Sequence, residues 1–317
     1  SVSVPNVREV VVLAKEQEVA DKLAQELLSG FTPKAKELYA ELQELRSTLS
    51  LAEDEEDDVL NCVDLAELME SEYDPTNVIE IYPKSLNDRL DAGARKGHHI
   101  VVFGQTNLGK TGFNVNLGSG VAYQGKRVLH LINEDRERDV YVRYVSNLSG
   151  MTKHEIRDNP SLANEKARPR GLDNVFVKAI RPGTPDQIKH YIEKYEPEVV
   201  IVDQLRNLQM KAENRTNQLE SAATAMRNLA KQCNVLMVSV TQAGDSASNK
   251  LVLTAGDVDS SNVGIPAQAD LLIGIGADEA AKAEGLRWLS IIKNKISGIE
   301  DQLPVKINTL LSRYTNV

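Results

Sequence analysis

The segment Gly104–Thr111 reads Gly-Gln-Thr-Asn-Leu-Gly-Lys-Thr and matches the pattern G-x-x-x-x-G-K-[ST]. Glycines in such a loop let the backbone curl so that successive N–H groups point at a phosphate chain. Lys110 supplies a cation for the outer phosphates, and the Thr111 hydroxyl can ligate Mg²⁺. The context favours a real site over a chance glycine turn, because a buried-strand pattern, His98–Phe103, precedes the loop and a helix start follows it. We expect the nucleotide to contact Gly104, Gln105, Thr106, Asn107, Leu108, Gly109, Lys110, Thr111 and Gly112.

Composition narrows the class of protein further. The 317 residues suffice for one large α/β domain and a smaller element. A net charge of −9 argues against a surface coated for nucleic acid, although a local basic lining inside an assembly remains compatible with it. Cys62 and Cys233 stand alone, without disulfide or metal spacing, which is typical of a reducing cytoplasm. No apolar run has the length of a membrane span and no basic-then-apolar leader opens the chain, so we expect a cytoplasmic protein without membrane contact.

Residues 1–75 differ from the rest and predict a mainly helical N-terminal or linker segment. Val7–Leu28 has a helical pattern, although Glu9–Leu13 is also compatible with a short strand. Pro33 can open a second helix, whose leucines recur at spacings of four, three and four and form one apolar stripe: Leu38, Leu42, Leu45 and Leu49. Six consecutive acids, Glu53–Asp58, predict an exposed linker, with a partner-binding acidic patch as the alternative.

Residues 76–317 alternate between strand and helix patterns. The predicted strands are His99–Phe103, Arg127–Ile132, Val175–Ala179, Val199–Val202, Val235–Val240, Leu271–Ile275, Leu286–Ile292 and Pro304–Leu310. The predicted helices are 111–124, 136–148, 185–195 and 216–232. Short connections without helices join the last three strands. This order predicts a largely parallel core with an antiparallel edge. Gly118 and Gly120 interrupt the first helix, which suggests close packing on the sheet.

Three strand ends carry polar residues suited to phosphate chemistry. Asp203 ends an apolar strand and is the expected carboxylate of the Mg²⁺ shell. Gln204 follows it, at a position where many such ATPases have a catalytic glutamate, so the base must come from elsewhere. We expect Glu134, at the end of a neighbouring strand, to activate the attacking water, with Asp135 as second choice. Gln242 ends another core strand and can sense a γ-phosphate through its amide.

Together these residues resemble the RecA-like motor of DnaB-like hexameric replicative helicases, over about residues 78–317. The stretches that carry the resemblance are Ile79–Asp88, Asn133-Glu134, Asn214–Gln242, Asp257–Asp270, Ile292–Lys295 and Arg313–Thr315. In Ile292–Lys295, Lys293 and Lys295 resemble the family's Lys-x-Arg, which reaches a neighbouring subunit's nucleotide. Lysine replaces arginine at position 295, which keeps the charge but loses the planar fork. Both lysines are expected on one face of a strand. Tyr314 resembles the family's closing aromatic, which can pack near the base.

The resemblance implies a P-loop NTPase of replicative-helicase type, of a phage kind, that hydrolyses ATP with Mg²⁺ between subunits of a homohexamer. Single-stranded DNA would pass through the ring. The loops at about 205–215 and 243–264 would contact it through backbone N–H groups and the cations Arg206, Lys211, Arg215 and Lys250. The N-terminal region would meet a primase or loader. A second basic group is instead expected in a solvated loop: Lys153, Arg157, Lys166, Arg168 and Arg170.

Two other functions compete with the helicase. The first is a RecA- or KaiC-like ring or filament ATPase that handles DNA without unwinding it. The second is a non-enzymatic assembly factor with a degenerate ATPase fold, and the presence of Lys110, Thr111, Asp203 and Glu134 argues against it.

Overall fold

The computed structural model describes residues 7–28, 30, 32–53, 65–74, 76–212, 214–260 and 263–317. The chain divides into two compact units, Ser1–Leu68 and Met69–Val317. Most of the acidic run, Asp54–Asp58, lies outside the described residues.

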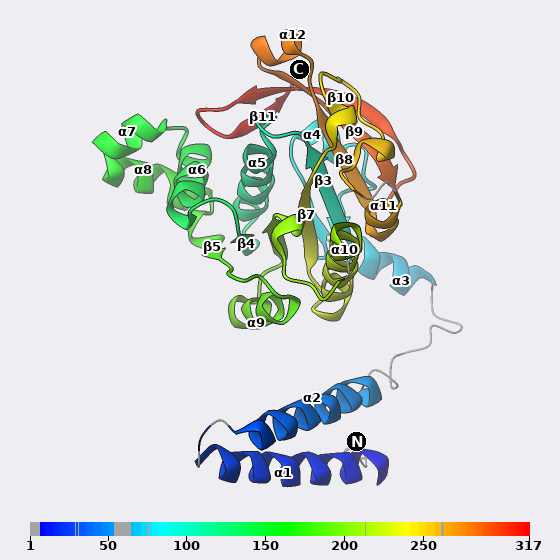
Figure 1. Cartoon of the computed structure of the whole chain (residues 1–317). Helices are drawn as coiled ribbons and strands as arrows, with labels where there is room; N and C mark the ends of the chain where they lie inside the picture. Colours follow the sequence, from blue (N-terminus) through cyan, green and yellow to red (C-terminus); the bar gives the residue numbers. More distant parts are fainter. Residues whose placement is uncertain are drawn as a thin grey trace. The chain divides into compact units, whose positions relative to one another are not determined.

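The N-terminal unit is a pair of helices, α1 (Val7–Leu28) and α2 (Pro33–Glu53) (Figure 1). Thr32 begins α2 by accepting a hydrogen bond from the Ala35 backbone N–H with its hydroxyl (3.1 Å). The described part of the leucine stripe packs on α1, in a small core of Val19, Leu23, Ala35 and Leu42 flanked by Ala20, Leu38 and Leu45. The alternative of a strand at Glu9–Leu13 is wrong, because these residues are helical.

The larger unit is built on one twisted sheet, and its nine described strands run in the order β11-β10-β9-β8-β3-β7-β6-β4-β5. The parallel strands are β3 (His99–Gly104), β4 (Val128–Ile132), β5 (Val175–Ala179), β6 (Val199–Asp203), β7 (Leu236–Gln242) and β8 (Leu271–Gly276). The antiparallel edge is formed by β9 (Leu286–Asn294), β10 (Asp301–Asn308) and β11 (Arg313–Asn316). The predicted α/β fold of RecA type, with an antiparallel C-terminal edge, is confirmed.

Helices cover both faces of this sheet (Figure 1). On one face lie α5 (Lys110–Tyr123), α6 (Glu137–Ser149) and α8 (Pro160–Ala167), in a core that includes Ile100 and Val102 of β3. On the other face lie α9 (Pro185–Tyr195), α10 (Arg215–Gln232) and α11 (Gly264–Gln268), against Val101 and Phe103 of the same strand. The alternation along β3 explains why its sequence is apolar throughout, since both faces are buried.

Several short elements were not predicted. A short helix, α12 (Glu279–Ala283), joins β8 to β9, so the expectation of helix-free connections is wrong there. The last strand, β11, escaped prediction because only four residues pair. The other unpredicted elements are α3 (Leu65–Glu72), β1 (Val78–Ile79), α4 (Lys84–Asn87), β2 (Ala94–Arg95), α7 (Lys153–Asp158), α8 and α11, and the single-turn helices η2 (Arg168–Arg170), η3 (Leu172–Asn174), η4 (Leu205–Asn207), η5 (Asp245–Ala247) and η6 (Ala255–Asp257).

The two glycines inside α5 make room for aromatic rings rather than for the sheet. A Cβ on Gly118 would lie 2.4 Å from the Tyr144 hydroxyl, and one on Gly120 would lie 2.3 Å from the Tyr82 ring. Tyr144 is fully buried on α6, and its hydroxyl lies 3.0 Å from His130 Nδ1 on β4. The glycines therefore let α5 pack closely against α6 and against Tyr82.

Candidate functional site

The phosphate loop lies between β3 and α5, where the sequence places it. Gly109 has φ of 99°, in the left-handed region that glycine tolerates, and it precedes the first residue of α5. The Lys110 side chain is buried, and its Nζ donates to the carbonyls of Gly104 (2.7 Å) and Gln105 (2.9 Å). Burial lowers the Lys110 pKa, while the nearby charges of Asp203 and Glu134 act to raise it. The loop thus holds a cation at the helix N-terminus, where phosphates bind.

Asp203 lies under this loop at the end of β6. Its Oδ2 accepts hydrogen bonds from the Thr111 hydroxyl (3.3 Å) and from Asn114 Nδ2 (3.5 Å). Only 6% of the residue is exposed, and burial raises its pKa to about 6, against the opposing effect of Lys110. A hydroxyl and a carboxylate side by side are the hard oxygen ligands that Mg²⁺ prefers, so these residues fit the ion.

Replacing Asp203 with asparagine should stabilise the nucleotide-free protein relative to wild type, and this gain in stability should be larger at neutral pH than at acid pH. Below the unfolded pKa of 3.8 both states are protonated, and above the folded pKa of about 6 the wild type carries a buried ionised carboxylate. The advantage of Asp203→Asn in free energy of unfolding should therefore grow by up to about 3 kcal/mol between pH 4 and pH 8. Urea unfolding at both pH values measures it, and a pH-independent difference would contradict it. The same variant should lose hydrolysis.

Asn133 joins the carboxyl ends of β4 and β6. Its backbone N–H donates to the Asp203 carbonyl (3.0 Å), and its Nδ2 donates to the Gln204 carbonyl (2.9 Å). Its Oδ1 accepts from the Gln204 backbone N–H (2.7 Å). Gln204 in turn donates from Nε2 to Glu134 Oε2. The residue that replaces the usual glutamate therefore orients the carboxylate that we expect to act as base.

A cavity of about 370 Å³ opens above the loop and brings most of the predicted residues together. It is lined by Thr106, Asn107, Gly109, Lys110, Thr111, Gly112, Glu134, Asp135, Arg143, Gln204 and Gln242. Gln242 thus lies beside the loop, as a phosphate sensor requires. Arg143 of α6 is an addition that sequence reasoning missed. No motif surrounds it, and only the packing of α6 on α5 places its cation at this cavity.

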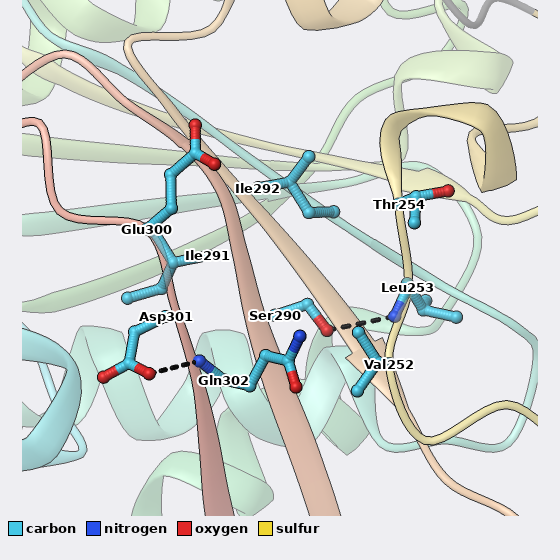
Figure 2. A pocket seen from close by; sticks show the side chains of 9 residues that line it. All are labelled: Val252, Leu253, Thr254, Ser290, Ile291, Ile292, Glu300, Asp301 and Gln302. Carbon is cyan, nitrogen blue, oxygen red and sulfur yellow. Dashed lines mark hydrogen bonds between the residues drawn. The ribbon is translucent and has the colours of Figure 1, made fainter.

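A larger cavity, of about 530 Å³, lies between the segment 252–254, β9 and the start of β10 (Figure 2). The Ser290 hydroxyl accepts a hydrogen bond from the Leu253 backbone N–H there (3.0 Å). Its charged lining residues are Glu300 and Asp301, and no cation is present among the described residues that line it. Carboxylates repel phosphates, so this cavity does not suit the nucleotide.

Tyr314 supports the backbone of the phosphate loop. It is 3% exposed, its ring packs edge-on against Phe113, and its hydroxyl donates to the carbonyls of Leu108 (3.3 Å) and Gly109 (3.2 Å). Arg287 supports the same segment, with Nε donating to the Leu108 carbonyl (2.9 Å). In this structure the Tyr314 ring is therefore unavailable for stacking on a base, and it holds the loop backbone instead.

Lys293 and Lys295 lie at the end of the sheet opposite to the phosphate loop. Lys293 Nζ donates to the Pro266 carbonyl (2.6 Å), and Lys295 Nζ lies 3.8 Å from Asp270 Oδ1. Asp270 adjoins the start of β3, since its backbone N–H donates to the His99 carbonyl. We expected both lysines to lie on one face of a strand. This is wrong for Lys295, because β9 ends at Asn294. The charges nevertheless remain close enough that Lys295 contributes to lowering the Lys293 pKa, after burial.

The four cations expected to contact DNA differ in environment. Lys250 pairs with the buried Asp257 (2.8 Å), and Arg215 pairs with Asp259 (2.8 Å). Asp257 also accepts from Ser246 and from Thr254. Burial acts to raise the Asp257 pKa, but the hydrogen bonds from Lys250, Thr254 and Ser246 outweigh it and lower the pKa to about 2. Lys211 is exposed, within the first loop. Arg206 is half-buried in η4, and its charge acts to lower the Lys110 pKa, so it lies near the nucleotide cavity.

The phosphate loop, the Asp203 strand end and the order of the sheet define a RecA-like P-loop ATPase. Residues 84–282 match the family described as the DnaB-like helicase C terminal domain, and the chain belongs to this family. It is accordingly an ATP-hydrolysing DNA helicase of replicative type. Among the described helices, none combines the length and apolarity needed to cross a membrane.

Individual relatives agree with this family. The chain is similar to the replicative DNA helicase DnaB of Haemophilus influenzae, with 23% identity over 98% of this chain and 73% of the relative. It is also similar to a probable replicative DNA helicase of Trieres chinensis, with 23% identity over 52% of this chain and 40% of the relative. These relatives do not favour the alternative of an ATPase that does not unwind DNA.

Solved structures share the fold. One of them, an isolated ATPase domain, has a TM-score of 0.68 at 16% identity, covering 80% of this chain and 96% of that one. A DnaB-like replicative helicase, solved in a study of its interactions with primase, has a TM-score of 0.74 at 15% identity and covers 98% of this chain and 77% of that one.

Proposed function

We propose that this chain is the motor subunit of a ring whose catalytic site is divided between two subunits. Lys110, Thr111, Asp203 and Glu134 would act on ATP from one side, and Lys293 and Lys295 of the next subunit would act from the other. The supporting observation is that the two lysines lie near the start of β3, whereas the phosphate loop follows the end of the same strand. Six strand residues separate these ends by about 17 Å.

The division of labour follows from the geometry. Glu134, held by Gln204, would take a proton from the attacking water. Thr111 and Asp203 would hold Mg²⁺, which supplies charge neutralisation at the phosphates when bound. Lys110 and Arg143 would bind the phosphate oxygens, and Gln242 would report their presence to the segment that follows β7. A cation from the neighbour would stabilise the charge that develops in the transition state. Because one catalytic site would take its residues from two neighbouring subunits, hydrolysis would require assembly of the ring.

Mixing two inactive variants should restore activity. Lys110→Ala chains keep Lys295, and Lys295→Ala chains keep the phosphate loop, so each homo-oligomer should hydrolyse ATP poorly. In a random equimolar ring, about a quarter of the interfaces pair an intact Lys110 with an intact Lys295. We expect up to that fraction of wild-type ATPase activity per chain. The matched control mixes Lys110→Ala chains with a double variant, Lys110→Ala with Lys295→Ala, because no interface in that mixture has an intact Lys110.

The mixing experiment has a clear negative result. If native mass spectrometry shows mixed rings and no activity returns, Lys295 works within its own subunit or has no part in hydrolysis. A rate per chain that is independent of protein concentration would contradict the divided site in the same way.

The DNA partner is proposed to be a single strand, bound through its phosphates. The described cations of the two loops, Arg206, Lys211, Arg215 and Lys250, stand in a chain of net charge −9. Two of them are ion-paired in this structure, so a DNA phosphate must displace Asp257 or Asp259 to reach them. The N-terminal unit is proposed to meet a primase or loader, and the domain boundary is proposed near residue 75.

Binding to single-stranded DNA should be insensitive to sequence and steeply sensitive to salt. Each phosphate contact contributes a slope of about −0.7 in log affinity against log salt concentration. Fluorescence anisotropy on oligonucleotides of different sequence measures both properties. Lys211→Gln should reduce the slope, whereas Lys166→Gln, an exposed lysine of α8, should leave it unchanged. Strong preference for one sequence, or equal effects of the two variants, would contradict this interface.

A further inference from the structure

A second cavity suited to a small ligand lies beside the later turns of α5. It has a volume of about 360 Å³, and its lining includes Asn116, Ser119 and Tyr123 of α5, Arg170 of η2, Arg313 of β11 and Tyr82. Ser119 follows Gly112 of the phosphate loop by about 10 Å along the helix. Between them the backbone of β11 crosses α5, where the Tyr314 N–H donates to Asn116 Oδ1 (3.0 Å). The cavity is therefore separate from the nucleotide site.

Two positive charges meet at this cavity without a carboxylate. Arg170 Nη1 donates to the Leu148 carbonyl (3.0 Å), and Arg313 Nε donates to the Asn147 carbonyl (3.0 Å), both in the last turn of α6. The C-terminus of a helix offers only about half a negative charge. Among the described residues, no acid lines the cavity and neither guanidinium has a carboxylate within ion-pair distance. A surplus of positive charge therefore faces the space.

Two buried polar groups on the floor of the cavity lack partners. Ser119 is 3% exposed and Asn116 is 8% exposed, yet Ser119 Oγ and Asn116 Nδ2 have no hydrogen-bond partner. A buried donor without an acceptor is costly, so such groups are usually satisfied by water or a ligand. Both groups can donate, and the two residues that carry them line the same cavity as the two arginines. Their common requirement is an acceptor, which an anion supplies.

The remaining wall is aromatic. The Tyr82 ring packs so closely on Gly120 that a Cβ there would lie 2.3 Å from it, which fixes the ring in place. Tyr123 is 67% exposed at the rim. These rings offer flat surfaces beside the cationic end of the cavity, and a base can stack on such surfaces.

We propose that this cavity is a second ligand site, which binds a phosphate group between Arg170 and Arg313 with Asn116 and Ser119 as further donors. The phosphate belongs either to free inorganic phosphate or to a mononucleotide whose base lies against the tyrosines. The site shares β11 with the phosphate loop, since Arg313 precedes Tyr314.

Calorimetric titration of the full chain with inorganic phosphate and with AMP tests this site. The Lys110→Ala substitution weakens ligand binding at the phosphate loop, and binding at the second cavity should persist in this variant. In that background Arg170→Gln should weaken binding by about tenfold, the loss expected for one charge-assisted hydrogen bond. Arg168→Gln is the matched control: it removes the same charge from the same short helix, where Arg168 pairs with Asp173 (3.6 Å). It should change affinity by less than about twofold.

A second variant, Ser119→Ala, removes an orphan donor without removing charge and should also weaken binding. Tighter binding of AMP than of phosphate assigns the site to a nucleotide, and equal binding assigns it to inorganic phosphate. The proposal is overturned if the Lys110→Ala chain binds neither probe at millimolar concentration. It is equally overturned if Arg168→Gln weakens binding as much as Arg170→Gln, or if affinity is unchanged in both Arg170→Gln and Ser119→Ala.

Discussion

Replacing Lys110 with alanine should abolish ATP hydrolysis while the chain still folds. Its ammonium group is the buried cation of the phosphate loop, and it is held by the carbonyls of Gly104 and Gln105 until a phosphate replaces them. Loss of one positioned electrostatic group costs about 10²–10³ in rate, and here ATP binding weakens as well. Steady-state phosphate release measures the loss, and circular dichroism with urea unfolding establishes that the fold remains.

The matched control for this change is Lys282→Ala, which removes an exposed lysine of α12 that lines no part of the nucleotide cavity. This variant should hydrolyse ATP at the wild-type rate. If the Lys110→Ala chain retained near wild-type hydrolysis, the phosphate loop would have no catalytic role. The assignment of this cavity to ATP would then be wrong as well.

Replacing Glu134 with glutamine should give a protein that binds ATP and hydrolyses it slowly. The amide can still accept the hydrogen bond that Gln204 Nε2 donates to the carboxylate, so the local geometry should persist. What is lost is the basic oxygen that takes the proton from water, and loss of a general base costs about 10²–10⁴ in rate. A rapid-quench measurement of the hydrolysis step, together with nucleotide affinity, separates this effect from weaker binding.

Asp135→Asn is the control, because Asp135 also lines the cavity but has no described hydrogen bond to Gln204. It should retain most of the activity. The opposite pattern, with Asp135→Asn inactive and Glu134→Gln active, would transfer the role of base to Asp135.

The sequence by itself determined the parts of the site whose positions depend on local order along the chain. A buried strand, a glycine loop and a helix start predict that Lys110 and Thr111 belong to a phosphate-binding loop, and parallel strands must bring their carboxyl ends to one edge. Asp203 and Gln242 each end such a strand and Glu134 lies two residues beyond one, so their proximity could be predicted without coordinates. The two helices of the N-terminal unit were predicted from the pattern of Val7–Leu28 and from the leucine spacing after Pro33, whereas their packing on each other was not.

The tertiary structure alone decided contacts between residues that no local pattern links. Arg143 reaches the nucleotide cavity only because α6 packs on α5, and Tyr314 lies behind the loop because β11 closes over the same helix. Lys295 lies beyond the end of β9, and the ion pairs of Lys250 and Arg215 depend on how the segment after β7 folds back. Periodicity records which face of an element is buried, whereas the partner that buries it is set by the packing of the whole sheet and its helices.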